Sequence, residues 1–268
     1  MKRILLLTDF SDNARKATTT AIRLYGPGNR YFLMNIHYMP MFGASRGDLY
    51  HWIEEDSSRN LNNELTSISE DLLKSKLNIT DFNIELVAER GFDDGVVLNF
   101  IRTKGIDLVV LGKGNVNNLI GSFTASIAHN SPVAVLIVPE DYECNSIKKV
   151  VFATDLLGVN KKMLITLIDF AKHNNSELYT LNVYKHNKAD SEEYEEQING
   201  YLSDLKHSFH YIQNKSIVEG ITQFAEEHQT DLLVILNRKD SLIERLFHVS
   251  MTQKLTTHSK RPIMVLHD

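Results

Sequence analysis

Hydrophobic runs alternate along the chain with segments of helical periodicity. The first run, residues 4–8, is continuous and apolar, which is typical of a parallel strand covered on both faces, and it stops at Asp9. Ser11, Asp12 or Asn13 can cap the helix that follows. Further strands are predicted at 31–36, 82–86, 107–111 and 133–138, with helical patterns between them.

This alternation of strand and helix predicts the fold class. Five strands with a helix between each pair imply parallel pairing through right-handed crossovers. The pattern therefore indicates a doubly wound α/β domain with a five-stranded parallel sheet in the order 3-2-1-4-5.

The same pattern then restarts after a linker near residues 139–143. Thr154-Asp155 repeats Thr8-Asp9 at the end of an apolar strand, and the later strands recur in the same order. The second copy lacks about two dozen residues between its second and fourth strands. Because each copy holds five strands and can close its own core, two tandem domains are expected, at 1–141 and 146–268. Packing of the two as an internal pseudo-dimer would cover their fifth strands, which would otherwise be exposed sheet edges.

Composition narrows the class of protein. The chain has 268 residues, of which 43% are hydrophobic and 24% charged, as in a globular protein with a sizeable core. The formal charge of −5 argues against nucleic acid as a partner. Cys144 is the one cysteine, which fits a reducing cytoplasm, and no apolar run approaches the ~20 residues that span a membrane. We therefore expect a cytoplasmic protein without an export signal.

The residues that could bind a ligand lie where the first and fourth strands end. In an open parallel sheet, ligands bind at the carboxyl ends of strands, where the strand order reverses. Thr8-Asp9 and the pair Gly112 and Gly114 should meet there, and Gly121-Ser122 opens the next helix, whose N-terminus favours an anion such as phosphate. The glycines do not match a P-loop or a dinucleotide fingerprint, so glycines that merely turn the chain are an equal alternative.

At these residues the chain resembles the universal stress protein family in its tandem two-domain form. The resemblance rests on residues 4–11, on 107–112, on Gly121-Ser122-Phe123, and on 134–138. Family members that bind ATP carry Gly-x2-Gly-x9-Gly-Ser/Thr in this loop. The resemblance implies that Asp9 lies by the ribose and phosphates and that the main chain near Ile36 meets the adenine. It also implies that the loop glycines and the residues at the helix start, from Gly112 and Gly114 to Gly121, Ser122 and Phe123, hold the phosphates.

The sequence departs from the family pattern in two places. The glycine pair is Gly-x-Gly and only 115–120 separates it from Gly121, so the loop is three or four residues short. A weak site, an AMP-like ligand and an empty site are therefore all compatible with it. In the second domain, the fourth strand ends Leu236-Asn237-Arg238-Lys239 without glycine, and Val249 stands at the position of Gly121, so no nucleotide is expected there.

Two functions follow as alternatives. The first is a stress-response protein that binds ATP, with Mg²⁺, or AMP in its first domain and alters a surface for a protein partner. The second is a scaffold in which both clefts are vestigial. No nucleophile–base pair and no metal-ligand spacing among the 11 histidines are apparent, so neither an enzyme nor a metal site is expected. The pattern leaves open a monomer or a homodimer.

Overall fold

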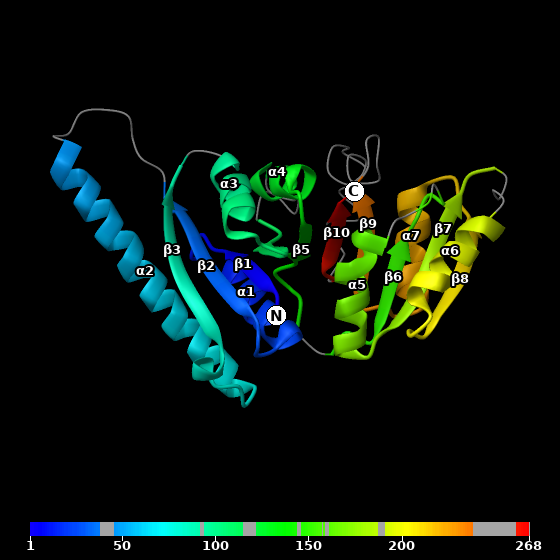
Figure 1. Cartoon of the computed structure of the whole chain (residues 1–268), viewed down its shortest axis with the longest axis horizontal. Coiled ribbons are helices and arrows are strands. Elements are labelled where there is room, and N and C mark those ends of the chain that lie inside the picture. The colour runs from blue at the N-terminus through cyan, green and yellow to red at the C-terminus, as the bar shows by residue number, and fades with distance from the viewer. Residues whose placement is uncertain are drawn as a thin grey trace. The chain divides into compact units, whose positions relative to one another are not determined.

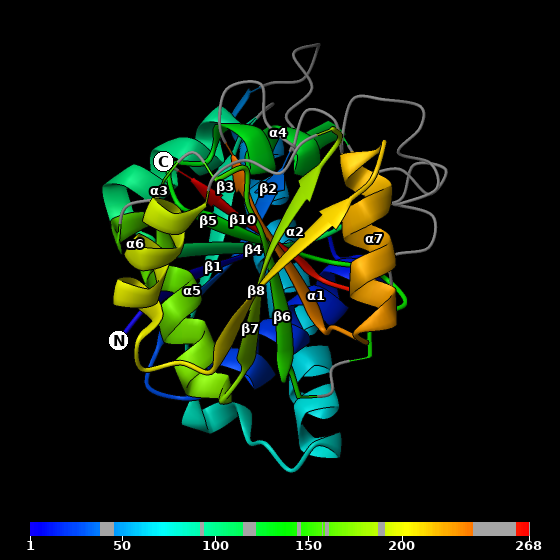
Figure 2. The ribbon, with the colours of Figure 1, turned by 90° about the vertical axis from the view of Figure 1, so that its right-hand side faces the viewer.

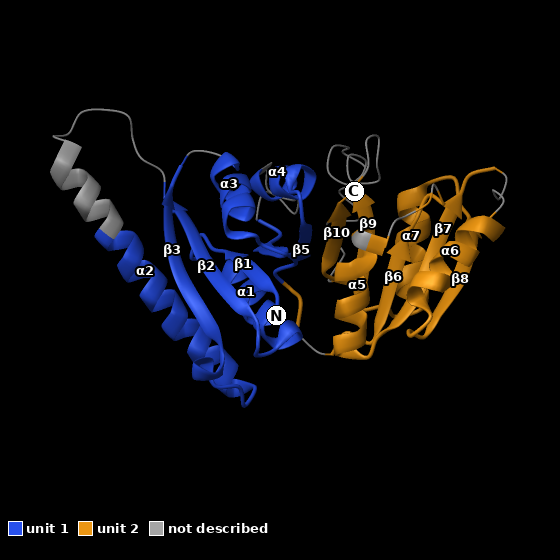
Figure 3. Ribbon diagram, viewed as in Figure 1, with its two compact units in different colours: residues 1–114, 121–140 blue, residues 115–120, 141–268 orange. Residues whose placement is uncertain are grey.

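The computed structural model describes residues 1–37, 46–91, 94–114, 122–143, 146–156, 158, 161–186, 191–237 and 261–267. Among these, the residues up to Glu140 form one compact unit and those from Asp141 onward form another (Figure 3). The two units are taken in turn below, as the first and second halves. The internal pseudo-dimer and the domain boundaries stay predictions.

The first half is a doubly wound α/β unit, as the alternation of patterns predicts (Figure 1). Its sheet has the order β3-β2-β1-β4-β5, and the four neighbouring pairs are parallel, which confirms the expected 3-2-1-4-5 arrangement. The elements are β1 (Arg3–Leu7), α1 (Asp12–Tyr25), β2 (Arg30–His37), α2 (Arg46–Lys74), η1 (Ile79–Asp81), β3 (Asn83–Arg90), α3 (Gly95–Lys104), β4 (Leu108–Gly112), α4 (Ser122–Asn130) and β5 (Ala134–Val138).

Burial explains why the central strands read as continuous apolar runs. All five residues of β5 are buried, and so are the last four of β1 and the first four of β4, because helices cover both faces of the sheet. Of the three candidate caps for α1, Ser11 is the one that caps it: its hydroxyl accepts a 3.2 Å hydrogen bond from the Ala14 N–H.

The second half repeats this topology. Its strands lie in the order β8-β7-β6-β9-β10, and the described neighbouring pairs are parallel. Figure 2 shows α5 and α6 on one face of the sheet and α7 on the other. The elements are β6 (Lys149–Ala153), α5 (Lys161–Asn174), β7 (Glu177–Tyr184), α6 (Glu192–Leu202), β8 (His207–Gln213), α7 (Ile217–Glu227), β9 (Leu232–Asn237) and β10 (Ile263–His267).

The residues missing from the second copy come mainly from one helix. The helix after the second strand has 29 residues in the first half, as α2, and 11 in the second, as α6. Both helices bury residues at a spacing of four, which keeps one face against the sheet: Glu64, Ile68 and Leu72 in α2, and Tyr194, Ile198 and Leu202 in α6. Shortening the helix therefore leaves the packed face in place.

The aspartate before each fourth strand has a structural role. The Arg3 N–H donates a 2.7 Å hydrogen bond to Asp107 Oδ2, and the Lys149 N–H donates a 2.9 Å bond to Asp231 Oδ2. Each aspartate thus holds the start of the first strand of its half beside the start of the fourth. The recurrence of Asp-Leu in the sequence reflects this bond.

Candidate functional site

Three neighbouring strands of the first half end at the predicted site. Thr8 and Asp9 follow β1, Ile36 lies near the end of β2, and Gly112 is the last residue of β4. The strands β2, β1 and β4 are adjacent and parallel, so these ends share one edge of the sheet. The Thr8 N–H donates to the Met34 carbonyl at 2.9 Å, which continues the β1–β2 pairing to the point where the site begins.

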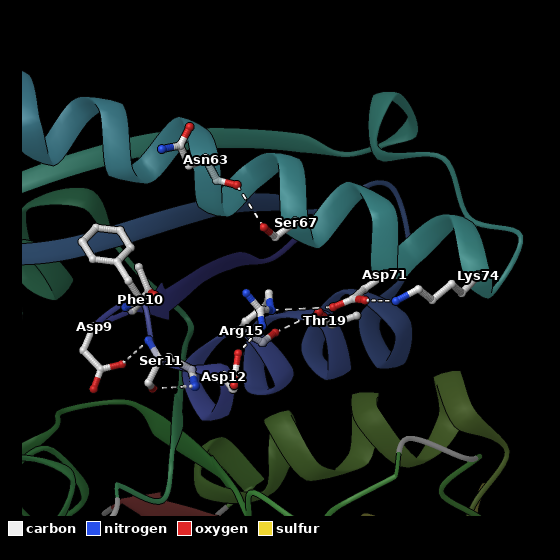
Figure 4. Close-up of polar contacts among 12 residues, drawn as sticks. Asp9, Phe10, Ser11, Asp12, Arg15, Thr19, Asn63, Ser67, Asp71 and Lys74 are labelled. Atoms are coloured by element: carbon white, nitrogen blue, oxygen red, sulfur yellow. Dashed lines mark hydrogen bonds and ion pairs between the residues drawn. The ribbon is translucent and has the colours of Figure 1, made fainter.

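The chain leaves β1 through a tight turn built on two side chains. The Phe10 N–H donates to Thr8 Oγ1 at 3.0 Å, and the Ser11 N–H donates to Asp9 Oδ1, also at 3.0 Å. Phe10 has a φ of 65°, a left-handed conformation that non-glycine residues rarely adopt. Figure 4 shows Phe10 and Asp9 pointing in opposite directions, and the Asp9 side chain is exposed. The turn therefore presents a carboxylate to solvent at the strand end.

The first bond of this turn and its left-handed residue recur in the second half. The Leu156 N–H donates to Thr154 Oγ1 at 3.2 Å, and Leu156 has a φ of 64°. An asparagine on the second strand anchors each turn: Asn35 Nδ2 donates to the Thr8 carbonyl at 2.8 Å, and Asn182 Nδ2 donates to the Thr154 carbonyl at 2.9 Å. Since both halves contain the turn, it belongs to the fold and does not by itself indicate a ligand.

Gly112, at the end of β4, and Gly114 lie against Asn13, a buried residue of α1. A Cβ on Gly112 would come within 2.7 Å of the Asn13 side-chain amide, which is closer than carbon atoms approach in proteins. In its favoured orientation, this amide accepts hydrogen bonds from the N–H groups of Lys113 and Gly114 at 3.1 and 3.2 Å. Gly114 has a φ of 73°, which favours glycine. The sequence identified Asn13 only as a possible helix cap, and its contact with the glycine loop was not predicted.

The start of α4 lies next to the glycine strand. Thr124 Oγ1 donates to the Gly112 carbonyl at 3.1 Å, and Phe123 is 40% exposed. Ser126 Oγ donates to Asp94 Oδ2, which fixes α4 to the beginning of α3 and lowers the pKa of Asp94. Gly121 and residues 115–120, together with the side chain of Ser122, lie outside the described residues, so their predicted contact with phosphate stays a prediction.

A buried carboxyl group lies behind the turn. Glu64 of α2 is 5% exposed, and its carboxyl lies close to the Thr8 side chain. Burial raises the pKa of Glu64, while the positive charge of Arg15 and the Thr8 hydroxyl act in the opposite direction. The sequence signal for Glu64 is an acidic residue within the apolar stripe of a helix, three residues after Leu61 and four before Ile68.

The positive charge of Arg15 acts on this group, and it is shared. The Arg15 guanidinium contacts Asp12 on α1 and lies 3.8 Å from the Asp71 carboxylate on α2, which is also paired with Lys74 at 2.7 Å (Figure 4). Arg15 therefore does not serve Glu64 alone.

The rest of the predicted chemistry falls partly outside the described chain. Arg238, Lys239 and Val249, on which the second half was expected not to bind nucleotide, lie outside it. Within the described ranges, no group of three histidine, cysteine or acidic side chains could hold a metal ion. The helices in those ranges are all too short or too polar to cross a membrane.

Comparison with known proteins identifies the fold independently. The model of the Universal stress protein family matches this chain twice, over residues 1–139 and again over 146–267. No curated protein sequence matches the chain.

Solved structures give the same result for the fold. A universal stress protein from Archaeoglobus fulgidus DSM 4304 aligns over 98% of this chain and 95% of its own length, with a TM-score of 0.68 and 16% identity. A Pseudomonas aeruginosa UCBPP-PA14 protein described as a universal stress protein aligns over 100% and 93%, with a TM-score of 0.59 and 12% identity. The cytoplasmic domain of a prokaryotic cation chloride cotransporter aligns over 100% and 95%, with a TM-score of 0.53 and 8% identity.

Proposed function

Because this chain belongs to the universal stress protein family, we propose that it is a cytoplasmic stress-response protein whose first half binds an adenine nucleotide, ATP or AMP. Occupancy of that half would alter a surface that a protein partner recognises. The protein would act by binding and not by catalysis. If ATP is the ligand, Mg²⁺ would accompany its phosphates.

The convergence of three strand ends carries this proposal. Asp9, the main chain of Ile36 and the glycines after β4 lie at one edge of the sheet, which is the edge where open parallel sheets bind ligands. The Asp9 carboxylate is exposed and held by the Ser11 N–H, so it is positioned to accept hydrogen bonds from ribose hydroxyls. Gly112 and Gly114 let the main chain come close to a ligand.

The test is calorimetry with ATP, ADP and AMP on protein stripped of nucleotide. Micromolar or tighter binding to the wild type is expected. Asp9→Ala should weaken it, whereas Asp155→Ala, the matched change in the second half, should not. Gly121→Val, which introduces the residue that the second half carries at the aligned position 249, should abolish it. Absence of binding to the wild type would refute the nucleotide proposal and leave the family assignment intact.

One observation favours the alternative, a scaffold that binds no nucleotide. The Asn13 side chain already accepts a hydrogen bond from the Gly114 N–H, which a phosphate would otherwise use, and the Lys113 N–H also donates to the Val138 carbonyl at 3.0 Å. The loop that follows is also short. A scaffold would carry no ligand after purification, and it would keep its protein partners in the Asp9→Ala variant.

A further inference from the structure

The described hydrogen bonds of the two strand-end turns match, but the group behind the turn differs between the halves. In the second half, Thr154 Oγ1 lies 2.7 Å from the hydroxyl of Tyr194, which is buried on α6. In the first half, the Thr8 side chain lies close to the carboxyl of Glu64, which is buried on α2. Both partners head the same stripe of buried residues at a spacing of four. The first half therefore has an ionisable acid where the second has a neutral phenol.

The environment of Glu64 does not fully compensate a charge. Its Oε1 atom has no hydrogen-bond partner among the described residues. The charged groups that act on it are Arg15 and Asp12 on α1 and Asp9 in the turn, and Arg15 also serves Asp12 and Asp71. Burying a carboxylate with one free oxygen near two other carboxylates is unfavourable. The neutral acid is accordingly favoured more strongly here than in water.

Glu64 also lies close to the strand-end turn. Its carboxyl approaches the Thr8 side chain, whose oxygen accepts a 3.0 Å hydrogen bond from the Phe10 N–H. Asp9, the residue between them, acts on Glu64 through its charge. The charge of Glu64 therefore acts on the turn that presents Asp9.

We propose that Glu64 is a positioning residue that couples nucleotide binding in the first half to the uptake of a proton. The argument rests on the proposed function and deepens it. A nucleotide phosphate next to Asp9 adds negative charge to a region that already holds Asp9, Asp12 and Glu64. Protonation of Glu64 removes one of these charges, so the proton and the nucleotide favour each other. By linkage, a ligand that strengthens proton binding is itself bound more tightly at lower pH.

The experiment measures AMP affinity by calorimetry between pH 5 and pH 8 for the wild type and Glu64→Gln. The glutamine has the shape of glutamate and no charge. The wild type should bind more tightly as the pH falls, by roughly tenfold for each unit by which AMP raises the pKa of Glu64. In Glu64→Gln, the pH dependence of AMP affinity that arises from Glu64 should be absent. The AMP phosphate titrates equally in both experiments, so its effect cancels when the wild-type affinity is divided by that of the variant. Titrations in buffers of different ionisation enthalpy should show fewer protons taken up by the variant.

Two further variants serve as controls. Tyr194→Phe removes the corresponding hydroxyl in the second half, and it should leave both the affinity and its pH slope unchanged. Glu64→Met, which has a similar volume and cannot titrate, should give the same flat ratio as Glu64→Gln and replaces it if the glutamine variant does not fold.

The outcomes separate the two proposals. AMP binding with the same pH slope and proton uptake in the wild type and both Glu64 variants would overturn this inference and leave the proposed function standing. If the wild type binds no AMP at any pH, the proposed function fails and the coupling fails with it.

Discussion

Gly112 and Asn13 occupy adjoining space so closely that a single added methyl group on Gly112 would lie 2.7 Å from the asparagine side chain. Asn13 is buried and its amide serves the glycine loop, so it has little freedom to move aside. This contact makes the glycine at the end of β4 a packing requirement, whether or not a ligand binds.

Gly112→Ala should therefore destabilise the protein. Overpacking of a buried contact typically lowers the free energy of unfolding by about 1–3 kcal/mol. Displacement of Asn13 should also remove its hydrogen bond from the Gly114 N–H and so disturb the glycine loop. Gly200→Ala in α6 is the control, because a Cβ there meets nothing within 4 Å. Urea denaturation should show a loss for Gly112→Ala and a neutral or slightly stabilising effect for Gly200→Ala.

Loss of either anchoring asparagine should cost stability. Asn35→Ala and Asn182→Ala each remove a buried hydrogen bond to the carbonyl that follows a first strand, with an expected cost of about 1–3 kcal/mol. Asn62→Ala on α2 removes an exposed bond to the Ser58 carbonyl and should change stability by less than about 0.5 kcal/mol. Only Asn35→Ala should also reduce AMP affinity in calorimetry. An equal reduction in Asn182→Ala would place the nucleotide elsewhere.

The stability of the ligand-free protein should depend on pH because the carboxyl of Glu64 is buried. Burial raises the pKa of Glu64 above 4.5, so the folded state binds the proton more tightly than the unfolded state. The stabilisation that protonation confers is complete below pH 4.5 and is lost as the pH rises through the raised pKa. Glu64→Gln should therefore gain stability relative to the wild type between pH 4.5 and pH 7, by about 1.4 kcal/mol per unit of pKa shift. Thermal unfolding at a series of pH values measures the difference, and a constant difference would contradict the expectation.

A histidine on the edge strand β8 should make the second half sensitive to acid. Burial beside the α7 helix and the neighbouring His228 lower the pKa of His210. The folded state then binds the proton less tightly than the unfolded state, so stability is complete above pH 6.5 and falls as the pH drops below it. His210→Gln should reduce the fall in Tm between pH 7.5 and pH 5.5. His173→Gln, on an exposed position of α5, should leave the fall unchanged.

The fold could be predicted from the sequence because its signals are local and repeated. Each signal arises from burial or from a bond within one pair of strands: the apolar run at residues 4–8, the Asp-Leu strands and the Thr-Asp strand ends. The order of these elements along the chain then allows only a few parallel sheet topologies. Leu73 shows the limit: it is an apolar residue of the long helix, yet it is 58% exposed, since periodicity alone does not determine where the sheet beneath a helix ends.

The candidate site could be predicted only in part, because its remaining contacts join residues far apart in the chain. Asp9 and Gly112 were identified from their positions at strand ends. The contact of Asn13 with the glycine loop depends on how α1 lies against β4, and the approach of Glu64 to Thr8 depends on how α2 packs on the first half. Neither contact produces a recognisable motif in the sequence. The repeated asparagine at 35 and 182 was visible, but its bond to the threonine carbonyl requires the register of two strands.

The length of α2 gives it the proportions of a lever. Its 29 residues extend about 44 Å, whereas an eight-residue strand such as β2 covers about 26 Å, so the helix is longer than the strands it packs on. Glu64 lies on the part that packs against the turn, and the segment from Arg46 to Leu61 spans about 22 Å. A tilt of about 5° at the packed part would move the other end by about 2 Å. A change in the charge of one buried carboxyl beside the turn would thus move the chain far from the strand-end turn, and α6, with 11 residues, is too short to amplify motion in this way.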